Sequence, residues 1–260
     1  MLTKSHGLGN DYLVADPADL PFAMTPARAK LLCDRHVGVG SDGVLLLEGR
    51  TGVRIINPDG SEAEKSGNGI RIFARWLVSS GRAAASTFTV QTRGGSVPVE
   101  VDGHQVTADM GRARFGAVTS LDIAPHVVTV DLGNPHCVVP RDHLGITDLR
   151  MLGPLIEHHT AFPNRTNVQL ARAVSNDRVE LLIWERGAGE TQASGSSACA
   201  VFAALHHLHL VDRAVTASMP GGELSLWLDE HDHIWMRGPV EEIAQVTLSP
   251  NLIARLQALP

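Results

Sequence analysis

Residues 57–71 read NPDGSEAEKSGNGIR, and residues 185–199 read ERGAGETQASGSSAC. Each stretch follows an apolar, β-rich segment and leads through a Gly-rich polar loop into a Ser-Gly pair and an apolar helical segment. Ser66 and Ser194 are separated by 194 − 66 = 128 positions, and Glu62 and Glu190 have the same spacing. Such agreement indicates an internal duplication, in which the two halves contribute to one site.

The repeat extends beyond these loops. Gly9-Asn10 has a counterpart in Gly133-Asn134, and residues 94–97 have one in residues 221–224, in the same order along both halves. The 260 residues are therefore expected to form two domains of similar fold that meet at a cleft. We place the first domain at 1–114 and the second at 115–247, with about 248–260 returning to the first.

The composition permits an ordinary globular core, with 43% hydrophobic and 19% charged residues. The formal net charge of −6 gives no electrostatic reason to expect a nucleic-acid partner. No run of 18 apolar residues occurs and the first residues lack the apolar core of a signal peptide, so we expect a cytoplasmic protein without a membrane partner. The three cysteines have no CxxC spacing, and we predict neither a disulfide framework nor a metal site.

Local patterns predict a strand-rich α+β chain with few helices. Thr25-Pro26 begins a helix that is expected to run to about His36, before Gly38 ends it. Apolar residues recur at helical spacing in 70–78 and 198–208, directly after the two paired loops. Strands are predicted over 44–48, 53–56, 87–92, 97–101, 127–132, 179–184, 223–228 and 234–237.

One nucleotide-binding pattern fails on its context. Residues 38–43, GVGSDG, satisfy GxGxxG, but a dinucleotide fingerprint needs a strand before it and a helix after it. Here the predicted helix comes first and the strand second, so we do not expect a nucleotide cofactor.

The paired loops suggest chemistry on a small anion. The first turn of a helix presents unpaired N–H groups and the positive end of a dipole, which suits a carboxylate. With Ser66 and Ser194 on opposite sides of the bound molecule, one group would remove a proton from carbon and the other would deliver one to the opposite face. This arrangement is typical of a two-base isomerisation.

Several further motifs accompany the two loops in order along the chain: GLGND (7–11), GNPH (133–136), RTN (165–167) and MPGGE (219–223). Together they resemble the diaminopimelate epimerase family. The resemblance implies two pseudo-symmetric α+β domains, each a curved, mostly antiparallel sheet around a central helix. It also implies epimerisation of LL- to meso-diaminopimelate in lysine and peptidoglycan precursor synthesis without pyridoxal phosphate or another cofactor, and it suggests a homodimer.

The resemblance assigns roles to individual residues. Four residues are assigned to the catalytic group: Ser66 and Ser194 at the two base positions, His136 near them, and Glu185. Glu185 and Arg186 are also expected to meet the distal ammonium and carboxylate of the substrate. Pocket amides are assigned to Asn10, Asn57, Asn68, Asn134 and Asn167, and backbone N–H groups for the reacting carboxylate to Gly67, Asn68, Gly195 and Ser196. Taken alone, Asn10 is more typical of a turn and Arg186 is more typical of a surface charge, and both serines are favoured residues at helix N-caps.

The family carries cysteine where this chain has Ser66 and Ser194. A thiol has a pKa of about 8.5, whereas a serine hydroxyl needs its own base to act. Since the flanking residues keep the family pattern, we expect a folded epimerase that is inactive or very weak, with the Cys→Ser pair introduced deliberately or by natural divergence. The alternatives are an amino-acid-binding protein without turnover and a serine-based racemase or isomerase of another substrate.

Overall fold

A computed structural model describes all residues, 1–260, and the chain divides into two compact units. The first unit contains residues 1–106 and 239–260, and the second contains residues 107–238. The chain passes from one to the other within β8 (Gln105–Asp109) and returns at the end of β17 (Ile234–Pro239). The boundary expected after residue 114 lies several residues beyond the first of these crossings.

The first unit is built mainly from antiparallel strands. Its elements are β1 (Leu2–Gly7), β2 (Asn10–Ala15), η1 (Pro17–Asp19), α1 (Pro26–Cys33), β3 (Val44–Glu48), β4 (Gly52–Ile56), β5 (Glu62–Ala63), α2 (Gly67–Ser79), β6 (Thr87–Thr92), β7 (Gly95–Asp102), β18 (Glu241–Val246) and α5 (Pro250–Gln257). Only the pairs β2–β3 and β4–β6 are parallel, and all its other named pairs are antiparallel.

The second unit repeats this order. Its elements are β9 (Arg114–Phe115), β10 (Val128–Asp131), β11 (Pro135–Pro140), α3 (Ile146–Glu157), β12 (Asn167–Ser175), β13 (Arg178–Glu185), β14 (Gly189–Thr191), α4 (Gly195–His207), β15 (Ala214–Met219) and β16 (Gly222–Leu228), followed by β17. Its parallel pairs, β11–β12 and β13–β15, correspond to β2–β3 and β4–β6. The strand order therefore carries the duplication that the sequence indicates.

Register confirms the repeat at the level of single residues. Ile55 pairs with Ala63 between β4 and β5, and Ile183 pairs with Thr191 between β13 and β14. Both members are shifted by 128 positions (183 − 55 and 191 − 63), the separation of Ser66 and Ser194. The loop before each serine thus leaves its sheet at the same place in both units.

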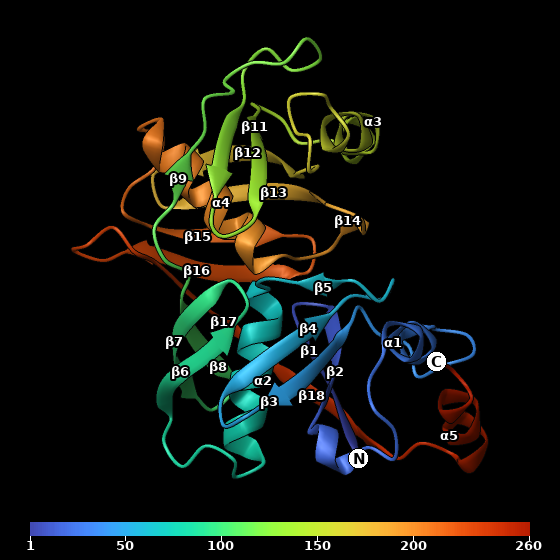
Figure 1. Cartoon of the computed structure of the whole chain (residues 1–260). Helices are drawn as coiled ribbons and strands as arrows, with labels where there is room; N and C mark the ends of the chain where they lie inside the picture. The colour runs from blue at the N-terminus through green and yellow to red at the C-terminus, as the bar shows by residue number, and fades with distance from the viewer. The chain divides into compact units, whose positions relative to one another are not determined.

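A central helix follows each of these loops. Helix α2 packs against β1, β2, β4 and β7 of its own unit, and α4 packs against β10–β13, β15 and β16 (Figure 1). The residues of α4 from Gly195 to Leu205 are all buried, which explains why apolar and small side chains run through the whole helix. The predicted α+β class, with two similar sheets and a central helix in each, is confirmed.

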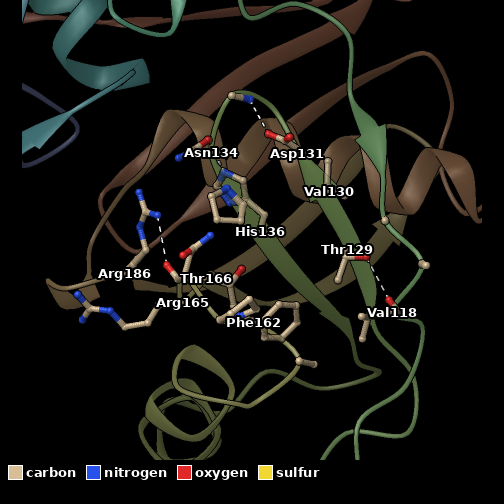
Figure 2. Close-up of a pocket in the computed structure, with 17 residues that line it drawn as sticks. Val118, Thr129, Val130, Asp131, Asn134, His136, Phe162, Arg165, Thr166 and Arg186 are labelled. Atoms are coloured by element: carbon tan, nitrogen blue, oxygen red, sulfur yellow. Dashed lines mark hydrogen bonds between the residues drawn. The ribbon is translucent and has the colours of Figure 1, made fainter.

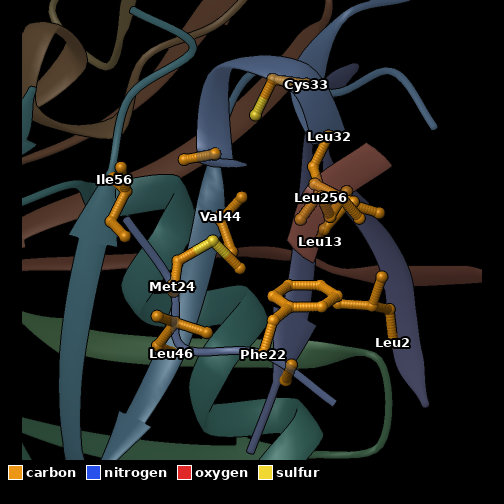
Figure 3. Close-up of a cluster of buried hydrophobic side chains, with 12 residues drawn as sticks. Leu2, Leu13, Phe22, Met24, Leu32, Cys33, Val44, Leu46, Ile56 and Leu256 are labelled. Atoms are coloured by element: carbon orange, nitrogen blue, oxygen red, sulfur yellow. The ribbon is translucent and has the colours of Figure 1, made fainter. Parts of the chain in front are cut away.

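Helices α1 and α5 contribute to an apolar cluster of the first unit (Figure 3). Val44 and Leu46 of β3 belong to this cluster, whereas Leu45 lies beside the start of α2, next to Gly69. Because β3 contributes side chains to both faces, it consists of consecutive apolar residues instead of alternating ones. Leu256 of α5 is fully buried in the same cluster, which attaches the C-terminal segment to the first unit.

Element limits mostly agree with the sequence patterns, and β3 and β6 have the predicted ends. The helix that begins after Thr25 is an exception, because it ends at Cys33 instead of about His36. Asp34 is extended, and its Oδ1 accepts hydrogen bonds from the backbone N–H groups of His36 and Val37. The carboxylate thus offers these amides an alternative to helical bonds, and the helix stops early.

Candidate active site

Ser66 lies directly before α2, at its N-cap position. Its Oγ accepts a hydrogen bond from the backbone N–H of Gly69 at 3.1 Å and lies 3.2 Å from the hydroxyl of Tyr12. Glycine at position 69 leaves room for both neighbours, because a Cβ there would lie only 3.1 Å from this Oγ and 3.2 Å from Leu45. The hydroxyl is therefore held by both the helix and a side chain from β2.

Two asparagines join this site in the first unit. Asn68 is buried in the first turn of α2, and its Nδ2 donates to Oδ1 of Asn10 at 3.2 Å. Asn10 in turn donates to Asp42 at 3.0 Å. Asn57 lies apart from this chain of contacts, in the turn after β4, where it donates to Ser61 at 3.0 Å.

Ser194 occupies the matching position before α4, but its environment differs. It is an N-cap residue by position and is only 6% exposed, yet its side chain accepts no hydrogen bond from the first turn of the helix. Gly195 and Ser196 begin α4, so their N–H groups belong to the set that a helix leaves without internal partners. Ser66 and Ser194 thus share a backbone setting but not a hydrogen-bond pattern.

His136 of β11 lies in a chain of amides and hydroxyls in the second unit. Nε2 of Gln169 lies 3.1 Å from Nδ1 of His136 and donates to Oγ of Ser197 at 3.0 Å. Nε2 of His136 lies 2.9 Å from Oδ1 of Asn134. With the amide N–H of Gln169 directed at Nδ1, the imidazole carries its proton on Nε2 and donates it to Asn134.

Burial makes this histidine a poor base. His136 is 1% exposed, and loss of hydration, together with the nearby Arg186 cation, lowers its pKa to about 3. The ring is neutral at ordinary pH, and both of its nitrogens face amides. The geometry suits a role in orienting Asn134, whose Nδ2 lies 3.5 Å from Oγ of Ser196.

The loop around Arg186 is fixed by side chains from three elements. Asn167 accepts from the backbone N–H of Arg186 at 3.0 Å and donates to the carbonyl of Pro135 at 2.9 Å. Glu185 accepts from the hydroxyl of Thr191 at 2.8 Å. Asn167 therefore connects β12 to the loops that carry Asn134 and Arg186.

Glu157 at the end of α3 also contacts the loop that carries Arg186. Its carboxylate accepts from Nε1 of Trp184 at 2.8 Å and from the backbone N–H of Gly187 at 2.9 Å. Arg165 donates to it at 3.3 Å, so the buried charge is paired. A buried and paired carboxylate of this kind keeps the two residues of the Glu185–Arg186 pair in one backbone conformation.

A cavity of about 470 Å³ opens beside these residues (Figure 2). Asn134, His136 and Arg186 line its polar part, and Val118, Val130 and Phe162 line an apolar part. Its volume is that of a site for a small molecule. A guanidinium and an amide at one end supply donors for a carboxylate.

The three cysteines of the chain lie in its interior. Burial raises the pKa of Cys137 to about 12 and that of Cys33 above its usual value, and all three cysteines are buried and outside any disulfide. No group of three His, Cys, Asp or Glu residues is placed to hold a metal ion. None of the helices is long and apolar enough to cross a membrane.

Sequence reasoning did not identify Tyr12, Glu157, Gln169 or Thr191. Tyr12 and Ser66 are 54 positions apart, and Gln169 and His136 are 33 apart. These contacts arise from strand pairing between distant segments, and no local sequence pattern predicts them. One signal was available for Tyr12, because it follows Asn10 by two residues, as His136 follows Asn134.

Comparison with known proteins gives a consistent result. The diaminopimelate epimerase family model matches residues 2–116 and 128–243. Diaminopimelate epimerase 2 of Nostoc sp. (strain PCC 7120) is 39% identical over 274 residues, covering 96% of both chains. The diaminopimelate epimerase of Pseudomonas syringae pv. tomato is 39% identical over 265 residues, covering 93% of this chain and 96% of the relative.

Solved structures support the fold. A hydroxyproline epimerase of Agrobacterium vitis with bound trans-4-hydroxy-L-proline superposes with a TM-score of 0.68 and 16% identity, over 96% of this chain and 92% of the other. A structure described as a predicted epimerase of Pseudomonas aeruginosa gives a TM-score of 0.71 and 19% identity, over 95% and 98%. From the sequence match across both halves, the chain belongs to the diaminopimelate epimerase family, a family of isomerases.

Proposed function

We propose that this chain epimerises diaminopimelate at an α-carbon without pyridoxal phosphate, and that the two serines make the reaction very slow. Ser66 and Ser194 occupy the positions of the two bases in this proposal. The main support for this proposal is the position of the two serines. Each is the N-cap residue of the central helix of its unit and directly follows a Gly-rich loop, in a chain of this family.

Substrate recognition rests on the second unit. Arg186 presents a guanidinium at the polar end of the cavity, and this planar cation pairs well with a carboxylate through two parallel N–H donors. Glu185 adjoins it and supplies an acceptor for an ammonium group. A ligand with a second amino-acid head presents a group of opposite charge to each of these side chains, whereas a shorter amino acid presents none.

The reacting carboxylate is proposed to meet N–H groups at the first turn of a central helix. Gly67, Asn68, Gly195 and Ser196 begin α2 and α4, and their N–H groups suit an anion. The dipole of each helix contributes about 0.3 to 2 kcal/mol at its terminus. This term is too small to make a serine hydroxyl as acidic as a thiol, and hence the rate is proposed to be low.

The test is exchange of the α-proton of LL-diaminopimelate for deuterium in D2O, followed by NMR. The unmodified chain is expected to exchange slowly, and the Ser66→Cys, Ser194→Cys chain at least about a hundredfold faster, because general acid–base groups contribute about 10² to 10⁴ in rate. A matched control introduces two cysteines elsewhere, Ser79→Cys and Ser225→Cys, at exposed serines of the first and second unit. It is expected to stay at the unmodified rate.

Failure of the double variant to exchange, when it is folded and binds the ligand, removes the epimerase proposal. A second candidate function is an amino-acid-binding protein without turnover. It is favoured by the hydrogen bond that Ser66 accepts from α2, because this bond is typical of a structural helix cap. Calorimetric binding of diaminopimelate by a chain that never exchanges the α-proton supports that candidate. Exchange of another amino acid in preference to diaminopimelate points instead to a related racemase.

A further inference from the structure

The two base positions are unequal, because a tyrosine contacts only one of them. Tyr12 lies on β2, is 6% exposed, and places its hydroxyl 3.2 Å from Oγ of Ser66. Ser66 uses one lone pair to accept from the N–H of Gly69. Its hydroxyl retains one proton and a second lone pair, so it can donate to the phenol or accept from it.

Gly43 provides the space for this tyrosine. A Cβ at Gly43 would lie 2.7 Å from Cε1 of Tyr12 and 2.7 Å from the carbonyl oxygen of Ile56. The glycine cannot easily move aside, because its own carbonyl accepts from the N–H of Leu13 at 3.0 Å and from Oγ of Ser41 at 2.9 Å. The last glycine of the GVGSDG stretch, Gly43, is therefore explained by packing against Tyr12 and not by nucleotide binding.

The second unit has no equivalent contact. Asn10 and Asn134 are 124 positions apart, and the same shift relates Tyr12 to His136 (12 + 124 = 136). His136 hydrogen-bonds with Asn134 and Gln169, not with Ser194. The phenol–hydroxyl pair therefore belongs to the first unit alone.

The phenol of Tyr12 is much closer in acidity to a thiol, which the family places at position 66, than a serine hydroxyl is. A phenol has a pKa of about 10 and a thiol one of about 8.5, whereas a serine hydroxyl is too weak an acid to act unaided. We propose that Tyr12 acts through Ser66 as a positioning residue and proton source, so that the first unit keeps a slow acid–base function. This proposal rests on the proposed epimerase function.

The proton balance is simple. When Ser66 protonates the α-carbanion, its O–H bond breaks and a C–H bond forms, while the proton of Tyr12 passes to Oγ of Ser66. Tyr12 is left as a tyrosinate, which regains a proton from water. In the reverse direction Ser66 takes the α-proton as its own proton passes to the tyrosinate, and no other reactant is needed.

The test uses the Ser194→Cys chain, which has a thiol in the second unit only. In D2O a single base exchanges the α-proton of the isomer it attacks, and deuterium appears in recovered starting material. Inversion to the other isomer also needs proton delivery by Ser66. The deuterated starting isomer and the inverted isomer are to be measured from both LL- and meso-diaminopimelate, with and without the Tyr12→Phe substitution.

The expected result is that Tyr12→Phe lowers the ratio of inversion to exchange by about tenfold or more, through kcat and not KM. In the Ser66→Cys, Ser194→Cys chain the same substitution is expected to lower that ratio by a much smaller factor, because the thiol carries its own proton. Dependence on the identity of residue 66 separates a proton role from a packing role.

Four outcomes overturn the proposal. Exchange without any inversion in the Ser194→Cys chain shows that Ser66 is inert even beside Tyr12. An unchanged ratio after Tyr12→Phe, or an equal loss in both backgrounds, shows that the phenol does not act through Ser66. Absence of exchange with either isomer, in a folded Ser194→Cys chain that binds the ligand, removes the epimerase function itself and this proposal with it.

Discussion

His136 illustrates how surroundings decide the role of a titratable side chain. The resemblance places it among the acid–base residues, but it is buried, and both ring nitrogens face amides. A neutral imidazole with a pKa of about 3 does not accept a proton near neutral pH. We therefore propose that it fixes the orientation of Asn134 instead.

The low pKa of His136 makes stability depend on pH. An unfolded histidine binds a proton below about pH 6.5, whereas folded His136 does so only near pH 3, so stability is lost as the pH falls through this window. Between pH 6.5 and 4.5 the loss from this group is about 2 kcal/mol. Urea unfolding of His136→Gln is expected to lack this component, and the exposed control His231→Gln is expected to keep it. Equal pH dependence of His136→Gln and the unmodified chain would contradict the burial argument.

Arg186 gives a second prediction for a single residue. Lysine keeps the charge but not the planar pair of donors, so Arg186→Lys is expected to raise KM for diaminopimelate by about tenfold, with a smaller change in kcat. The measurement uses the Ser66→Cys, Ser194→Cys chain. Arg150→Lys, on an exposed arginine paired with Glu190, is the matched control. A fall in kcat alone would place Arg186 near the reacting carbon instead of at the distal end.

The two central helices differ at their first turns although their sheets repeat. Ser66 caps α2 through its side chain, whereas Ser194 does not cap α4. Helix α4 is buried along almost its whole length, and its stability comes mainly from packing. The local cap therefore matters more for α2.

This difference predicts unequal effects of alanine at the two positions. Ser66→Ala is expected to lower the free energy of unfolding by about 1 kcal/mol, as for loss of an N-cap. Ser194→Ala is expected to change it by less than about 0.5 kcal/mol, because no cap bond is lost. Urea unfolding at pH 7 measures both, and a larger loss for Ser194→Ala would refute the assigned hydrogen-bond pattern.

At the scale of the whole molecule, the sequence predicts the repeat and most element positions. The matched loops place both serines before helices, and β3 and β6 have the expected ends because turn residues flank them. The links from Tyr12 to Ser66 and from Gln169 to His136 depend on strands that are distant in sequence. The sequence alone predicts neither the burial of His136 nor the packing of Tyr12 against Gly43.

The resemblance also suggests a homodimer, and this remains a prediction. Sedimentation equilibrium at micromolar concentration is expected to give twice the 27.8 kDa mass of the chain. Exposed apolar side chains are present on α3, at Ile146, Met151 and Leu155, and they are the first positions to examine by substitution. A single species with the mass of one chain would end the dimer prediction.

We propose that the chain acts on an amino acid with two charged heads. The most direct measurement compares α-proton exchange of LL-diaminopimelate and L-lysine by the Ser66→Cys, Ser194→Cys chain in D2O. Lysine lacks the distal carboxylate that Arg186 is proposed to bind, so its exchange is expected to be slower by about a hundredfold or more. Equal rates for the two amino acids, or exchange of lysine alone, would contradict the account.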